Sequence, residues 1–235
     1  MTIDFKFIAE TFPKVIAALP VTFLITVSAV VAGAVIGFLL ALVHIKRIPV
    51  LNQIIEIYIS FFRSVPLIIL LFCSYYGAPK LINVLFHSGE KVIGTSQISS
   101  LAVAIIVFAL YSIAFVSELI RGALSSVDMK QMEAAHSIGM TKLQAYLRII
   151  IPQAIIVALP NYFNFVLATL KNTSLVFAIT VMDIMTTAKI SAETGYRFIE
   201  AYLMVGTIYV VVGIVLSRIF KGVENQSKKK MGIIV

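Results

Sequence analysis

The sequence alternates long apolar runs with shorter polar segments, and the long runs have the length of membrane-spanning helices. An α-helix needs about 20 apolar residues to cross the hydrocarbon core of a bilayer. The apolar run at 175–185 is too short to cross, so we predict a short re-entrant or interfacial helix before the last span. The predicted spans lie at about 19–43, 54–76, 98–120, 153–170 and 199–220. The pattern therefore predicts an all-α integral membrane protein with five transmembrane helices, in which residues 1–235 form a single transmembrane domain.

Two prolines lie inside predicted spans away from the start of the helix, where they should disturb it, whereas Pro20 is near the start of the first span, where proline is tolerated. Proline lacks a backbone N–H and disfavours helical geometry in the residue before it. We therefore expect the second span to bend or break at Val65–Pro66 and the fourth span to be interrupted at Pro160. The polar segment 171–174 should end the fourth span.

Small residues recur at every fourth position of the first span. Such a ladder allows a neighbouring helix to approach closely. We favour packing within the helix bundle over a contact between two copies of the chain. The ladder consists of Ala29, Gly33, Gly37 and Ala41.

Composition supports the membrane assignment, because 60% of the residues are hydrophobic and only 13% are charged. A soluble domain is nearer half apolar and about a quarter charged. The net charge of +8 is typical of Lys and Arg that flank spans, so membrane lipid is an expected partner and nucleic acid is not. Lys and Arg are more numerous on the side of the segment 128–148, which predicts a cytoplasmic loop, an external N-terminus and a cytoplasmic C-terminus.

Several polar residues fall inside the predicted spans. Arg63 is either a hinge or pathway residue or an arginine that extends toward the cytoplasmic surface. Glu118 and Arg121 are three residues apart, and we favour a structural ion pair over a gate. Four further residues either line a substrate pathway or form hydrogen bonds across helices: Tyr111, Ser112, Asn161 and Asn164.

The motifs of common active sites do not occur in the sequence. It contains no phosphate-binding G-x-x-x-x-G-K-[ST] loop, no H-E-x-x-H and no G-x-S-x-G. The three histidines and the single cysteine, Cys73, are not clustered in sequence. We therefore predict no catalytic, cofactor or metal site in this chain. A transport subunit, a passive channel and a membrane scaffold protein remain as function classes.

The segment 128–148 and the start of the fourth span carry a motif. Glu133-Ala134-Ala135 is followed after three residues by Gly139, and after nine more by Ile149-x-Ile151-Pro152. This spacing resembles the EAA motif of permease subunits of bacterial ABC importers, with Ile151 at a position where Leu is usual. The polar amino-acid branch of that family is similar at 62–67, 75–77, 118–122, 152–160 and 170–175, and the cystine-importing branch at 48–67.

The resemblance implies a permease subunit in a bacterial plasma membrane that alternates between inward-open and outward-open states. Partner ATPase subunits would bind ATP and Mg²⁺, a binding protein outside the cell would deliver an amino acid, and a second permease would be an identical copy or a paralogue. The loop would form short coupling helices against the ATPase. Glu133 would pair with a cation of the partner, Ala134 and Ala135 would allow close approach, and Gly139 would permit a sharp turn.

Five residues depart from the pattern of many family members. Ser64-Val65 stand where Gly-Thr is frequent, Leu70 where Gln is, Tyr111 where Asn is, and Asn172 where an acid is. Most of these changes lower the polarity or charge near the expected pathway. The substrate therefore does not follow from the family resemblance.

Overall fold

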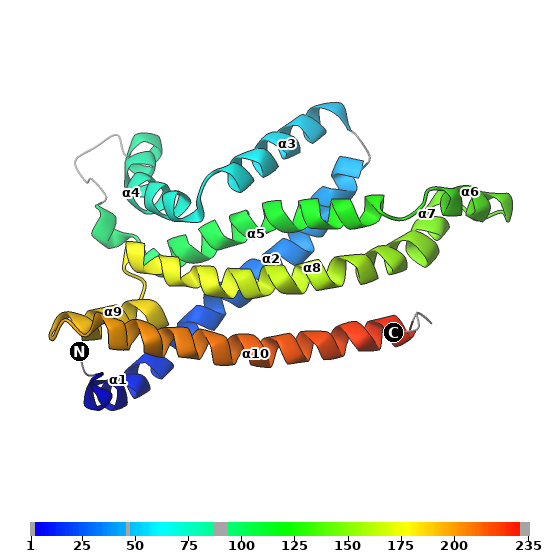
Figure 1. Ribbon diagram of the computed structural model, residues 1–235. Helices are drawn as coiled ribbons and strands as arrows, with labels where there is room; N and C mark the ends of the chain where they lie inside the picture. The colour runs from blue at the N-terminus through cyan, green and yellow to red at the C-terminus, as the bar shows by residue number, and fades with distance from the viewer. Residues whose placement is uncertain (1–2, 46–47, 87–93, 231–235) are drawn as a thin grey trace.

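The computed structural model describes residues 3–45, 48–86 and 94–230, and nearly all of them lie in helices (Figure 1). Three further helical turns connect the α-helices: the 3₁₀ turns Thr95–Gln97 and Thr173–Ile179 and the π-turn Tyr146–Ile150. The α-helices are α1 (Phe5–Ala17), α2 (Leu19–Ile45), α3 (Pro49–Ser64), α4 (Leu67–Phe86), α5 (Ser100–Ser125), α6 (Lys130–Ser137), α7 (Lys142–Ala145), α8 (Ile151–Asn172), α9 (Ile184–Glu193) and α10 (Phe198–Lys230).

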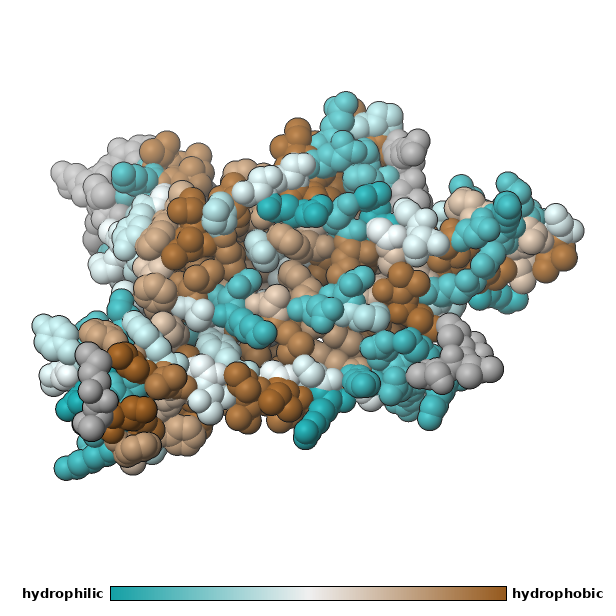
Figure 2. Space-filling model, in the orientation of Figure 1, coloured by the Kyte–Doolittle hydropathy of each residue, from teal (hydrophilic) through white to brown (hydrophobic). Residues whose placement is uncertain are grey.

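Among the described residues, five helical segments are long and apolar enough to cross a membrane. They contain α2, α4, α5, α8 and α10, so the predicted fold class is confirmed. The space-filling view shows hydrophobic residues over the bundle and hydrophilic residues at the α6–α7 end (Figure 2). α1 was not predicted. It precedes α2 directly, and its N-terminus is capped by the Asp4 side chain, which accepts a hydrogen bond from the backbone N–H of Phe7.

The second predicted span, 54–76, is wrong as a single helix because the chain breaks inside it. Val65 is extended, with φ −86° and ψ 128°, between the end of α3 and the start of α4. Proline disfavours helical geometry in the residue before it, and Pro66 cannot donate to α3. The break at Val65–Pro66 is as predicted, but only α4 has the length and apolarity of a span.

The predicted interruption at Pro160 is also wrong, because α8 runs through it from Ile151 to Asn172. A proline inside a membrane helix is tolerated when neighbouring groups compensate for the missing hydrogen bond. The fourth span does not stop at 171–174 either, since the 3₁₀ turn Thr173–Ile179 continues it. Thr180, with φ 60°, ends that turn. The short helix before the last span is therefore α9. It lies C-terminal to most of the segment 175–185, where the short re-entrant or interfacial helix was predicted.

α2 crosses the bundle diagonally (Figure 1) and packs against α5 more extensively than any other pair of described elements. A Cβ atom added at Gly33 would lie 3.1 Å from the carbonyl oxygen of Ser112, and one added at Gly37 would lie 3.0 Å from the backbone nitrogen of Ser117. The small-residue ladder therefore packs within the bundle, as predicted.

Candidate functional site

α6 and α7 project from one end of the bundle and form the loop predicted at 128–148 (Figure 1). The carboxylate of Asp128 accepts a hydrogen bond from the backbone N–H of Lys130 at 2.9 Å, at the start of α6. Gly139 ends the helix with φ +82°, and the N–H of Met140 donates back to the carbonyl of Ala135 at 3.0 Å. A left-handed glycine after the last helical turn is a common helix terminator. Gly139 thus makes the predicted sharp turn.

A capping box begins α7 immediately after this turn. The hydroxyl of Thr141 accepts from the N–H of Gln144 at 3.3 Å, and the side-chain oxygen of Gln144 accepts from the N–H of Thr141 at 2.9 Å. These two bonds satisfy backbone donors that a helix start leaves free. The π-turn Tyr146–Ile150 then connects α7 to α8 without a loop. The two short helices are thus defined by local hydrogen bonds.

The inner side of the loop packs against the end of the bundle. Met132 and Ala135 of α6 and Ala145 of α7 lie in one buried cluster with residues of α5 and α8. The side-chain amides of Gln131 and Gln153 also exchange hydrogen bonds, which join α6 to the start of α8. The loop is therefore attached to two long helices.

The outer side of the loop is exposed and partly apolar. Glu133, Ala134 and Gly139 are exposed, as a contact surface requires. Ile138 is 74% exposed and Leu143 is 68% exposed. Ala135 differs from the prediction: it is 2% exposed and packs inside this chain, so it is not available to a partner. The helical repeat turns its side chain away from the face that carries Ala134.

Arg63 lies at the end of α3, beside the break, and approaches α5. Its guanidinium is 3.9 Å from the carboxylate of Glu118 and 5.6 Å from the ring centre of Phe115. Arg121 donates to both oxygens of Glu118, one bond being 2.8 Å long. Glu118 and Arg121 therefore form the predicted ion pair, and Arg63 extends it to α3.

The other predicted pathway residues have different environments. Tyr111 is partly buried in a ring cluster, with its centroid 4.4 Å from that of Phe115 and 6.5 Å from that of Phe165. Ser112 is fully buried against α2, so its assignment to a pathway surface is not supported. Asn161 and Asn164 are exposed on α8.

Lys171 was not predicted as a site residue, because the segment 171–174 was interpreted as a break. In the structure Lys171 is part of α8 and is exposed. It follows Asn161 by ten residues and Asn164 by seven residues. These spacings place the three residues on one face of the helix, with the exposed Ala168 between them. We call Asn161, Asn164 and Lys171 the polar stripe. Hydrophilic patches interrupt the hydrophobic surface along α8 in Figure 2.

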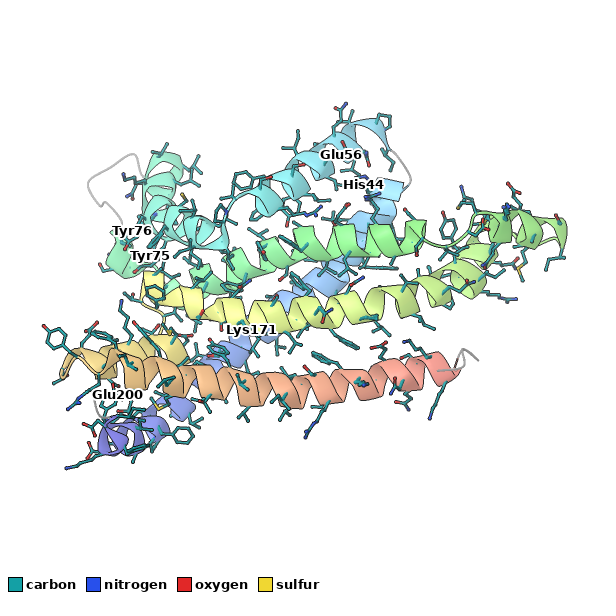
Figure 3. The ribbon with its side chains drawn as sticks, viewed as in Figure 1. His44, Glu56, Tyr75, Tyr76, Lys171 and Glu200 are labelled. Carbon is teal, nitrogen blue, oxygen red and sulfur yellow. The ribbon has the colours of Figure 1, made fainter. Side chains whose placement is uncertain are left out.

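No group of three or more His, Cys, Asp or Glu residues in the described ranges is arranged to hold a metal ion. The charged side chains of the helices form pairs instead. One group of ion pairs surrounds Glu118, and His44 of α2 lies 3.7 Å from Glu56 of α3 (Figure 3).

The sequence was compared with protein-family models and with known proteins, and both kinds of match are to membrane subunits of transport systems. Residues 33–229 match the family model "Binding-protein-dependent transport system inner membrane component". The probable amino-acid permease protein YxeN of Bacillus subtilis is 41% identical over 216 residues, covering 92% of each chain. The L-cystine transport system permease protein TcyL of the same organism is 37% identical over 232 residues, covering 99% of this chain and 95% of the relative.

Solved structures show the same fold. A crystal structure of an amino acid ABC transporter with histidines matches with a TM-score of 0.83 and 30% identity, over 96% of this chain and 100% of that chain. The MetNI methionine ABC transporter in an inward-facing conformation matches with a TM-score of 0.69 and 16% identity, over 91% of this chain and 95% of the other. The second match supports the fold alone. The chain therefore belongs to the family of binding-protein-dependent transport system inner membrane components, and the predicted resemblance to ABC importer permeases is confirmed.

Proposed function

We propose that this chain is a permease subunit of an ATP-driven importer of polar amino acids, and that the α6–α7 loop receives the movement of a partner ATPase. The observation that carries the proposal is the two-sided packing of the loop. Its outer side exposes Glu133, Ala134, Ile138 and Leu143, while its inner side is buried in the chain's own core. A partner bound to the outer side would move α5 and α8 with the loop.

The path of this movement follows from the contacts of the loop. α5 leads into α6 through a short connection, and the Gln131–Gln153 pair joins α6 to α8. The ion pairs of Glu118 then join α5 to Arg63 at the break between α3 and α4. Large motions of packed helices need residues that absorb the change in backbone angles. The break at Val65 is the candidate for that role.

The partners follow from the same assignment. ATP and Mg²⁺ would bind to separate ATPase subunits, and this chain would carry no cofactor. A binding protein would deliver the amino acid from outside, and a second permease, identical or paralogous, would complete the pathway. The α6–α7 end would face the cytoplasm together with the C-terminal end of α10, and the N-terminus would lie outside (Figure 1). The positive-inside rule supports this orientation.

Cystine is the specific substrate that we propose. The support is the 37% identity to a relative named as an L-cystine transport system permease protein. Glu133, Ala134 and Gly139 would make the ATPase contact, while Ala135 would support the loop from inside. A passive channel would give the exposed face of this loop no partner, and co-purification of an ATPase through the loop would argue against a scaffold protein as well.

The test is reconstitution of the permease with its ATPase and binding protein in proteoliposomes. Glu133→Lys and Ala134→Trp should abolish co-purification of the ATPase and ATP-dependent uptake. Glu10→Lys is the matched control, because it makes the same charge change at an exposed site on α1. Full co-purification and uptake in both loop variants would refute the coupling role. Uptake that persists without any ATPase would support a passive channel.

A further inference from the structure

The polar stripe of α8 (Asn161, Asn164 and Lys171) is exposed on a helix that crosses the membrane. We infer that this stripe lines the substrate pathway, and that Lys171 makes the pathway selective for the carboxylates of amino acids that carry no net positive charge. The inference rests on the proposed function as an importer and adds a class of substrate to it.

Its neighbours on α10 place Lys171 near the middle of the predicted span 199–220. The hydroxyl of Thr173, two residues further on, is 3.3 Å from the hydroxyl of Tyr209. Tyr209 stands halfway along the apolar run of α10 that was predicted as the span 199–220. Lys171 itself lines a groove together with Tyr209 and Gly213 of α10. The stripe therefore ends at mid-depth and not at the outer surface.

A lysine at this depth does not face lipid. Charged residues inside membrane segments are costly there, and they face the bundle interior or a water-filled space. None of the three stripe side chains has a hydrogen-bond or ion-pair partner among the residues that the structure describes. Their polar groups are thus left for water, for a second permease chain or for a passing substrate.

The groove beside the stripe carries charge of one sign. It lies between α8 and α10, has a volume of about 460 Å³, and extends from Lys171 to Arg218 and Lys221 near the C-terminal end of α10. No Asp or Glu belongs to its lining among the described residues. Figure 3 shows Lys171 between these two helices. A lining with one sign of charge raises the local concentration of the opposite ion.

The chemistry of the stripe fits the two ends of an amino acid. The Lys171 ammonium donates to a carboxylate in a charge-assisted hydrogen bond. The amide oxygens of Asn161 and Asn164 can accept from the substrate ammonium, and neither adds charge. A cationic side chain would meet Lys171 without a neutralising acid. Cystine, which has two carboxylates and two ammonium groups, has no net charge and suits this surface.

Thiol labelling tests the inference in the absence of any substrate. Ala168→Cys places a thiol on the stripe, in a chain whose exposed Cys73 is replaced by serine. The assembled transporter is treated with two membrane-impermeant methanethiosulfonates, one carrying a sulfonate and one a trimethylammonium group. Both reagents react with the same thiolate, so the ratio of their rates, divided by the same ratio for a small thiol in free solution, reports the local potential. We expect the thiol to react, with a normalised ratio that favours the sulfonate.

Lys171→Gln in the same background should lower the sulfonate-to-ammonium rate ratio by roughly tenfold or more, because one nearby positive charge is removed. Lys171→Arg should keep the ratio, and Lys14→Gln, an exposed lysine of α1, should not change it. Val215→Cys, on the side of α10 away from the groove, should stay unreactive. An unreactive Ala168→Cys, or a ratio unchanged by Lys171→Gln, would overturn the inference.

Uptake gives the second measurement. Lys171→Gln should reduce ATP-dependent cystine uptake by about 10-fold to 100-fold, the loss expected for a hydrogen bond between charged groups, while ATPase co-purification stays intact. Lys171→Arg should restore most of the uptake. If the wild-type transporter prefers arginine over cystine, the selectivity is refuted, but the importer function stands. If uptake needs no ATPase, the proposed function itself is refuted.

Discussion

Gln131 and Gln153 lie 22 residues apart in the chain, and their side-chain amides donate to each other. One of these bonds is 3.1 Å long, and the amide of Gln153 also donates to the carbonyl of Ile149 at 3.0 Å. The first turn of α6 is thereby fixed to the first turn of α8. A movement of the loop cannot occur without a movement of the span unless these bonds break.

Loss of this pair should uncouple the transporter. Gln131→Leu leaves the partly buried amide of Gln153 with fewer partners, at a cost of about 1–2 kcal/mol to loop attachment. We expect the ATPase still to bind, and the number of substrate molecules transported per ATP to fall severalfold. Simultaneous measurement of uptake and phosphate release in proteoliposomes checks this. Gln226→Leu, at an exposed position of α10, should leave the ratio unchanged.

Gly139 should not tolerate a β-carbon. Its φ of +82° costs other residues about 1–2 kcal/mol, since the β-carbon then approaches the backbone. Gly139→Ala should therefore weaken ATPase binding about 5-fold to 30-fold, measured by titration of the purified ATPase onto the permease. Gly139→Asn should be milder, because asparagine adopts left-handed geometry more readily. Equal affinity in both variants and wild type would show that the turn is not required.

The contact between α2 and α5 should be sensitive to one added methyl group. A Cβ at Gly37 would meet the backbone nitrogen of Ser117 at 3.0 Å and the carbonyl of Ile113 at 3.1 Å. Backbone atoms cannot move aside cheaply, so Gly37→Ala should destabilise the protein by about 1–3 kcal/mol. Gly206→Ala is the control, because its Cβ would meet nothing within 4 Å. Thermal unfolding in detergent should separate the two variants by several degrees.

Asp183 should make stability depend on pH. Burial raises the pKa of its carboxyl group, which caps α9 through Thr186 and has one oxygen without a partner among the described groups. A carboxyl with a raised pKa binds its proton more tightly in the folded state. Its stabilising contribution is therefore complete below the unfolded pKa and is lost as the pH rises through the folded pKa.

Asp183→Asn removes this titration while it keeps an oxygen that can accept from Thr186. We expect the fall in melting temperature as the pH rises above about 4, the ordinary pKa of an aspartate carboxyl group, to be smaller in the variant than in the wild type. A fall of the same size in both proteins would show that other groups cause it. Asp4→Asn, at the partly exposed cap of α1, is a comparison for general effects of losing a carboxylate.

The fold was largely predictable because length and apolarity define spans. The two prolines show what the sequence leaves open. Pro66 and Pro160 both lie in apolar runs, yet only the residue before Pro66 leaves the helix. The local sequence contributes, because Val65 is β-branched whereas Ala158 and Leu159 are good helix formers, and the packing of the two sites differs as well. At the first site Arg63 is drawn toward α5 by Glu118, whereas Tyr162 beside the second donates to the Val30 carbonyl of α2 at 2.9 Å.

The coupling loop was predictable because a motif marks its position in the chain. The spacing from Glu133 to Gly139 identified the loop and its turn. It could not show that Ala135 faces inward or that Ser112 packs against Gly33, because these directions depend on tertiary contacts. Lys171 was missed because a polar residue after an apolar run is typical of a helix end, and the 3₁₀ turn that extends the span has no clear sequence signal.

The close contact of α2 with α5 limits how the molecule can change shape. Gly33 and Gly37 leave no space in which the two helices could slide past each other. Both must therefore shift together as one unit, and any change of conformation has to be confined to the elements around them.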